Sequence, residues 1–324
     1  IANPDADDAV VDLVPHLPNG ALVAETDEIF VPRRSTVARP VKFSAAQGLP
    51  FSVEAVARTG RFVVGGVITH QGQPSTFVPG QSTPRSSWSF AGGFSGNGHQ
   101  TTLLVSNPST SPLQVSARVI GDKGAFDLHD PAFDKPIPSG ALAQIPINPP
   151  TTASSPASGG SFGLQVSSRD GTHYIAALRV SSALAGAQQV AYVDPGTALP
   201  DRSWLVPGAT GGKVVLVNTS DSAVTAQLIP VGGQPSGQAA TRNGGKAATG
   251  TGRGATAPPP TQALTLPPGR VVVRDVPGQV DALDVEAGEP GVLVALLGEG
   301  EAIPGAVVGG VPAGGPVVQG PAAS

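Results

Sequence analysis

The sequence predicts an all-β protein made of three tandem Ig-like antiparallel β-sandwich domains. Three observations predict it. The 43 Gly and 34 Pro residues punctuate short Val- and Ala-rich segments, which favours strands and turns. No segment carries an apolar stripe at the i, i+3, i+4, i+7 spacing of an amphipathic helix, so we expect almost no helix. The same strand-and-turn pattern is written three times along the chain, about one domain length apart.

Each copy opens with an apolar run that ends in Asn and a turn, at Asn3, Asn107 and Asn218. Asn suits the turn because its side chain closes an Asx-turn, and Pro follows it in the first two copies. Apolar residues then stand six, eight and ten positions beyond each Asn, which is the period of a half-buried strand. They are Ala9, Val11 and Leu13; Leu113, Val115 and Ala117; Val224, Ala226 and Leu228.

Two further landmarks follow in every copy. An apolar residue and Pro precede an extended run, and a hairpin built on Gly comes after it. The apolar-Pro steps are Val31-Pro32, Ile137-Pro138 and Leu266-Pro267; the extended runs are 36–41, 141–147 and 271–276; the hairpin glycines are Gly60, Gly171 and Gly291.

These landmarks predict the domain boundaries. Sandwich 1 spans 1–84 with its first strand truncated, sandwich 2 spans 85–201 and sandwich 3 spans 202–313. An insertion at about 237–262 is poor in large apolar residues, so we expect a mobile loop, followed at the chain's end by a flexible tail over 314–324.

Trp88 and Trp204, the only two Trp residues, stand in the first strand of the second and third copies. We expect them at the seams between domains, where a large ring stiffens the array. The alternative is that each packs in the core of its own sandwich.

The chain has no Met and no Cys, and Ile1 falls inside an opening strand. We therefore expect a fragment that lacks an N-terminal leader or membrane anchor. No apolar run of 18 residues is present, and the net charge of −4 offers no broad basic surface for nucleic acid.

The densest ligand-like cluster is Asp127, His129 and Asp130, with Asp134 nearby; it has no counterpart in the other copies. Carboxylates and an imidazole suit a divalent cation, whereas the alternative is a solvated loop with Asx-turns beside Pro131. Gly159-Gly160-Ser161-Phe162-Gly163 fits the G-x-S-x-G motif of hydrolases, but a strand rather than a helix is expected to follow. The scattered histidines indicate no catalytic triad, and we expect no cofactor and no enzyme.

The first copy carries a series of arginines between residues 33 and 61. If folding gathers its arginines, they would meet phosphate or uronate groups of an envelope polymer. The alternative is an ordinary solvated face. The arginines concerned are Arg33, Arg34, Arg39, Arg58 and Arg61.

The apolar-Asn turn, the apolar-Pro step and the Gly hairpin resemble those of a family of actinobacterial extracytoplasmic proteins with tandem sandwich repeats. That resemblance implies an N-terminal membrane anchor and a large membrane glycosyltransferase encoded nearby. The expected function is a non-enzymatic spacer and docking scaffold of the cell envelope, with the glycosyltransferase as the suspected partner. The alternatives are a module that binds a glycan or an anionic polymer, and a hydrolase using Ser161 or the 127–134 segment.

Overall fold

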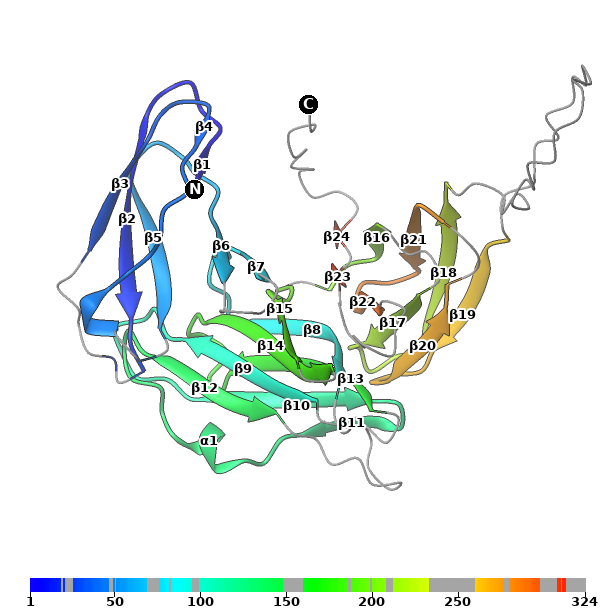
Figure 1. The fold of residues 1–324 in the computed structure, drawn as a ribbon. Coiled ribbons are helices and arrows are strands. Elements are labelled where there is room, and N and C mark those ends of the chain that lie inside the picture. The colour runs from blue at the N-terminus through cyan, green and yellow to red at the C-terminus, as the bar shows by residue number, and fades with distance from the viewer. Residues whose placement is uncertain are drawn as a thin grey trace, which may run out of the picture. The chain divides into compact units, whose positions relative to one another are not determined.

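The protein is described by a computed structural model, and its fold is all-β (Figure 1). Within the described residues the helical elements are a single turn, α1 (Pro131–Asp134), and a 3₁₀ turn, η1 (Ser44–Ala46). None of them is long enough to cross a membrane as a helix. The structure describes residues 1–18, 20, 26–46, 49, 51–68, 76–81, 83–94, 99–147, 160–185, 188–198, 200–207, 212–232, 260–276, 280–297, 308–309 and 311–312.

The chain divides into two compact units, Ile1–Leu199 and Pro200–Ser324. The first unit holds repeat one (residues 1–84) and repeat two (85–201, up to its end at 199), and the second holds repeat three (202–313). The predicted insertion lies outside the described residues up to position 259, and the predicted tail lies wholly outside them. The division into three separate domains stays a prediction.

Repeat two is a sandwich of two antiparallel four-stranded sheets (Figure 1). We name the sheet that contains Trp88 the Trp sheet and the sheet whose strand ends at the Asn turn the Asn sheet. Side chains from both sheets pack into one core, including Phe90 and Leu164 of the Trp sheet and Leu103 and Ile145 of the Asn sheet. The Trp sheet runs β11 (Gly124–Asp127), β10 (Val115–Gly121), β13 (Ser161–Ser168), β8 (Ser87–Phe94); the Asn sheet runs β12 (Leu142–Ile147), β9 (Gln100–Ser106), β14 (Ala176–Ala185), β15 (Gln188–Asp194).

Repeat three has the same strand order, with one short strand added beside β16. Its Trp sheet runs β19 (Gln262–Leu266), β18 (Val224–Val231), β21 (Ala282–Ala287), β16 (Ser203–Pro207), β24 (Val311–Pro312). Its Asn sheet runs β20 (Val271–Asp275), β17 (Lys213–Asn218), β22 (Val292–Leu297), β23 (Val308–Gly309).

Repeat one is less complete in its described residues. The sheet that corresponds to the Trp sheet contains no Trp and has three strands, without a counterpart of β8 or β16. The part that corresponds to the Asn sheet consists of two short ribbons, joined by a bridge between Ala2 and Val63. The extended run predicted over 36–41 is a strand only at its start, where Ser35 and Thr36 pair with β1. The three-stranded sheet runs β3 (Asp27–Val31), β2 (Ala9–His16), β5 (Ser52–Thr59). One ribbon pairs β1 (Ala2–Asn3) with β4 (Ser35–Thr36), and the other pairs β6 (Gly65–Ile68) with β7 (Thr76–Pro79).

The Asn turn is built in the same way in all three repeats. Asn107 is fully buried; its Oδ1 accepts from the Ser109 amide at 3.0 Å, which closes the predicted Asx-turn. Its Nδ2 donates to the carbonyl oxygen of Ser111 at 2.9 Å and, 30 residues along the chain, to that of Ile137 at 3.0 Å. Asn3 and Asn218 make the corresponding bonds. The nine apolar residues predicted to face the core behind these turns are all buried.

Trp88 and Trp204 take equivalent places in the cores of their own sandwiches. The Nε1 of Trp88 donates to the carbonyl oxygen of Ile175 at 2.7 Å, and the Nε1 of Trp204 to that of Val292 at 2.9 Å. Each acceptor lies at the start of the strand that returns from the Gly hairpin. The structure thus favours the core alternative over the expected interdomain role, because burial within one sandwich already satisfies both the ring and its N–H group.

Candidate functional site

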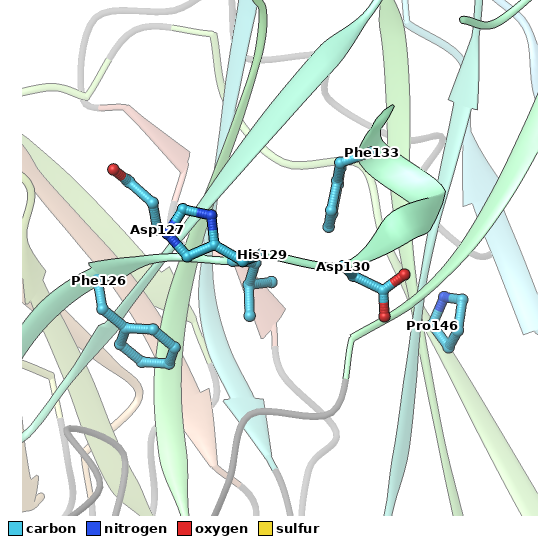
Figure 2. Close-up of a pocket in the computed structure, with 7 residues that line it drawn as sticks. Phe126, Asp127, His129, Asp130, Phe133 and Pro146 are labelled. Atoms are coloured by element: carbon cyan, nitrogen blue, oxygen red, sulfur yellow. The ribbon is translucent and has the colours of Figure 1, made fainter. Parts of the chain in front are cut away.

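The segment around Asp127 borders a hollow of about 340 Å³ on repeat two (Figure 2). Its floor is apolar: Phe133 is buried in the core, and Phe126 and Leu128 pack against that core. His129 and the two carboxylates stand at its rim. In Figure 2 the carboxylate of Asp127 points away from the side where Asp130 faces Pro146.

This segment does not assemble a set of cation ligands. Among the described residues, which include Asp127, His129, Asp130 and Asp134, no three His, Asp or Glu side chains are placed to hold a metal ion. Asp130 caps α1, its Oδ1 accepting from the Ala132 amide at 2.8 Å, with Pro131 in the first turn. Asp134 accepts from Arg169 at 2.8 Å. The cluster therefore orders a loop, as the solvated-loop alternative expects, although the Asp-Pro pair starts a helical turn that was not predicted.

Two of the five candidate arginines are neutralised by carboxylates of their own repeat. Arg58 donates from Nε to Asp12 and from Nη1 to Glu28, each at 2.6 Å. Arg61 binds both oxygens of Asp5, at 2.6 and 3.0 Å, and hydrogen bonding from Arg61 lowers the pKa of the Asp5 carboxyl.

The remaining arginines do not complete a cationic surface. Arg39 lies 3.6 Å from a carboxylate oxygen of Asp27. Arg33 donates its backbone amide to Asp8 at 2.9 Å, and Arg34 has a left-handed backbone (φ 50°) in the same turn. Acidic side chains thus lie beside the arginines, with Arg58, Asp12 and Glu28 together on the β3-β2-β5 sheet, which leaves little net positive charge for an anionic polymer.

Ser161 starts strand β13 and is buried, and its register partner is Phe94 on β8. The strand runs on to Ser168, so no helix follows the G-x-S-x-G motif. The strained strand-to-helix turn that exposes a nucleophile in hydrolases is absent here.

The structure brings together one constellation that the sequence did not indicate. The Oγ of Ser111 lies 3.0 Å from Nε2 of His173, and the Nδ1 of His173 lies against Oδ2 of Asp170. This is the connectivity of a Ser-His-Asp triad. Asp170 also accepts hydrogen bonds from the backbone amides of Thr172 and His173. Together with the bond to the His173 ring, these bonds hold the pKa of the Asp170 carboxyl well below its usual range.

Comparison of the repeats explains this constellation as a structural link. It ties the Gly hairpin of repeat two to its Asn turn. Repeat one ties the same two loops with Arg61 and Asp5, and repeat three ties them with Thr219, whose amide and Oγ1 both donate to the Gly291 carbonyl oxygen at 2.8 Å. Three unrelated polar contacts at one place indicate that the link, rather than its chemistry, is what the fold requires.

No family model matches this chain, and neither does any curated protein or solved structure that it was compared with. The function must therefore be argued from the repeats themselves.

Proposed function

We propose that this protein is a non-enzymatic, extracytoplasmic scaffold of the cell envelope, made of three Ig-like sandwiches that space and dock a partner protein. The observation that carries the proposal is the recurrence of one structural unit: the same buried Asn turn, with the same hydrogen bonds, is built three times along the chain. Sandwiches in tandem space their ends apart, and their outer strands recruit extended polypeptide through main-chain hydrogen bonds.

The distribution of polar groups supports the same proposal. The buried Asn residues form turns, the arginines of repeat one pair with carboxylates, and the Ser111, His173 and Asp170 side chains link two loops. The family resemblance adds a membrane glycosyltransferase as the proposed partner and an N-terminal anchor as the proposed means of localisation.

Affinity capture from detergent-solubilised envelope membranes, after cross-linking, tests the proposal. We expect one membrane protein to be enriched over a capture with denatured bait. Recovery of no protein partner would count against docking. Saturable pelleting with cell-wall polymer that weakens with salt would favour the alternative anionic-polymer module instead.

An activity-based fluorophosphonate probe tests the enzymatic alternative. We expect Ser111 to stay unlabelled, since its contact with His173 has a structural counterpart in the other repeats. Labelling that a Ser111→Ala variant abolishes would contradict the non-enzymatic assignment.

A further inference from the structure

Repeat two buries an ion pair in its own sandwich. Among the residues that the structure describes, Arg179 and Asp194 are the only charged side chains that are buried, at 0% and 5% exposure. The Nη2 of Arg179 donates to Oδ2 of Asp194 at 2.8 Å, but its Nε and Nη1 are buried and have no hydrogen-bond partner in the protein. Removing two charges from water is costly, and one hydrogen bond offsets only part of that cost. The pair is therefore a poor means of stabilising this core.

Repeat three shows that the fold does not need the pair. Leu296 takes the place of Arg179, because each pairs with the residue four positions before the Asn of its repeat. The last strand then places Val308 opposite Leu296, as β15 places Asp194 opposite Arg179. The same two positions thus hold an apolar pair in repeat three.

Repeat one also has uncharged residues at these two positions. The residue before its Asn bridges to Val63, and Gly66 stands three residues beyond Val63. In repeat two, Arg179 likewise stands three residues beyond the partner of the residue before the Asn. Gly66 pairs with Val78 on β7. A charged pair at this place is therefore a property of repeat two alone.

The last strand of repeat one lies close to the place that β15 fills. Within the first unit, β7 is packed against β15 (Figure 1). Just after β7, the side-chain amide of Gln81 donates to the carbonyl oxygens of Ala177 on β14 at 2.5 Å and of Pro195 at 2.6 Å, and its Oε1 accepts from the Ala177 amide at 3.2 Å. A competing last strand is thus within reach of β14 when the chain folds.

Exchange of the last strands would leave a buried charge without its partner. If β7 or β23 paired with β14 in the native register, Arg179 would face Val78 or Val308. If β15 paired with β6 or β22, Asp194 would face an uncharged residue of repeat one or three. Breaking a buried ion pair in this way favours the correct strand by at least about a hundredfold. Repeat proteins are prone to such misassembly, because their strands resemble one another.

We propose that the ion pair of Arg179 and Asp194 sorts the last strands of the three repeats during folding, so that β15, and neither β7 nor β23, completes the Asn sheet of repeat two. The pair acts by excluding wrong partners rather than by adding stability. This inference concerns assembly of the array and does not depend on the docking function.

Disulfide trapping measures which strand pairs with β14. The chain has no Cys, so Val180→Cys and Val193→Cys introduce one reporter pair at register partners on β14 and β15. The reduced chain is unfolded in urea, refolded and oxidised, and the disulfide between positions 180 and 193 is quantified by mass spectrometry. Chains in which another strand pairs with β14 leave this disulfide unformed.

The main variant gives repeat two the residues of repeat three, Arg179→Leu with Asp194→Val, in the reporter background. We expect its stability to urea to be at least equal to that of the reporter chain, because the costly pair is gone, and its yield of the native disulfide to be at least about twofold lower. An undiminished yield would overturn the proposal. A yield that falls only in proportion to a lower stability would also overturn it.

Two variants of repeat three provide a matched comparison that leaves the ion pair of repeat two intact. Leu296→Arg with Val308→Asp copies the pair, whereas Leu296→Asp with Val308→Arg has the same composition and the opposite polarity. The copied pair makes β15 and β23 interchangeable, so we expect at least about twofold less of the native disulfide. With the reversed pair, exchange of β15 and β23 brings like charges together, so the yield should stay within about a fifth of that of the reporter chain. Equal yields from these two variants would overturn the proposal.

Discussion

The Nδ2 of Asn218 donates to the carbonyl oxygen of Leu266 at 3.1 Å, across 48 residues of chain. The same group also donates to the carbonyl oxygens of Ser222 at 2.8 Å and Pro267 at 3.1 Å, while Oδ1 accepts from the Ser220 amide. One buried amide thus holds a turn, the end of β19 and the apolar-Pro step together. Asn107 makes the corresponding four bonds and Asn3 makes three of them, so one buried Asn side chain fixes the turn in each repeat.

Replacement of Asn218 by Ala is expected to lower the free energy of unfolding of repeat three by about 3 kcal/mol, since several buried polar groups lose their partners at once. Urea denaturation in a Trp88→Phe background measures it, because Trp204 then reports alone. Asp221→Ala, at an exposed position of the same turn, is the control and should change stability by less than about 0.5 kcal/mol. Equal effects of the two substitutions would contradict a central role of the Asn.

The two Trp residues are expected to emit at short wavelength and to resist quenching by acrylamide, because they are 6% and 3% exposed. We expect Trp204→Phe to cost about 1–2 kcal/mol, mainly for the unpaired Val292 carbonyl, and Trp204→Ala about 3–5 kcal/mol for the cavity. Steady-state fluorescence and urea denaturation measure these effects. Ready quenching of both residues would place them outside the cores.

A buried ion pair crosses two strands of the Asn sheet of repeat two. The Nη2 of Arg179 donates to Oδ2 of Asp194 at 2.8 Å, and the guanidinium lies 5.9 Å from the centre of the Phe90 ring. Burial raises the pKa of the Asp194 carboxyl against the opposing charge of Arg179. Arg179→Met leaves the carboxylate uncompensated, so we expect a loss of about 3–5 kcal/mol at pH 7.

The pH dependence of that variant follows from the sign of the shift. A raised folded-state pKa contributes stability that is present below the unfolded value of about 3.9 and is lost as pH rises through the folded value. The deficit of Arg179→Met should therefore be smaller at pH 4 than at pH 7, as measured by urea denaturation. Adding Asp194→Asn should restore part of the loss at pH 7. A deficit that is independent of pH would show that Asp194 is not the cause.

His16 joins repeat one to repeat two in its protonated form. Its Nε2 lies 2.9 Å from the Glu54 carboxylate and its Nδ1 lies 3.1 Å from the Gly140 carbonyl oxygen. Both partners only accept hydrogen bonds, so both ring nitrogens must donate, which a neutral imidazole cannot do. The hydrogen bond with Glu54 raises the pKa of His16.

The stabilisation from this pair should be present below the unfolded His pKa of about 6.5 and should be lost as pH rises through the higher folded value. Thermal unfolding of the first unit, compared between pH 6 and pH 9, measures the loss. Glu54→Gln keeps the shape of the side chain and removes its charge, so it should flatten this part of the pH profile. A wild-type profile that Glu54→Gln leaves unchanged would contradict the assignment.

Sequence patterns predicted much of the fold and little of the candidate sites. The alternation behind each Asn placed Val11, Val115 and Ala226 in the core correctly, because strand periodicity is local. The Asx-turns are also local and were predicted. The hydrogen bond from Asn107 to the Ile137 carbonyl oxygen could not be predicted, because it joins the Asn turn to the apolar-Pro step, which only folding brings together.

The partners of the candidate site residues could not be predicted either, because they are distant along the chain. Arg58 and Arg61 look like free cations along the chain, and only strand pairing brings Asp12, Glu28 and Asp5 to them. The contact between Ser111 and His173 also spans 62 residues, which no spacing rule covers.

The sequence by itself determined that this chain is all-β, that one strand-and-turn pattern recurs, and where the core side of the strands behind each Asn lies. These properties depend on turn chemistry and on the alternation of neighbouring side chains, which are written locally. The tertiary structure alone decided which polar groups neutralise one another and that both Trp rings close their own sandwiches. Those outcomes depend on pairings between distant strands, whose register is set by packing of the whole sheet.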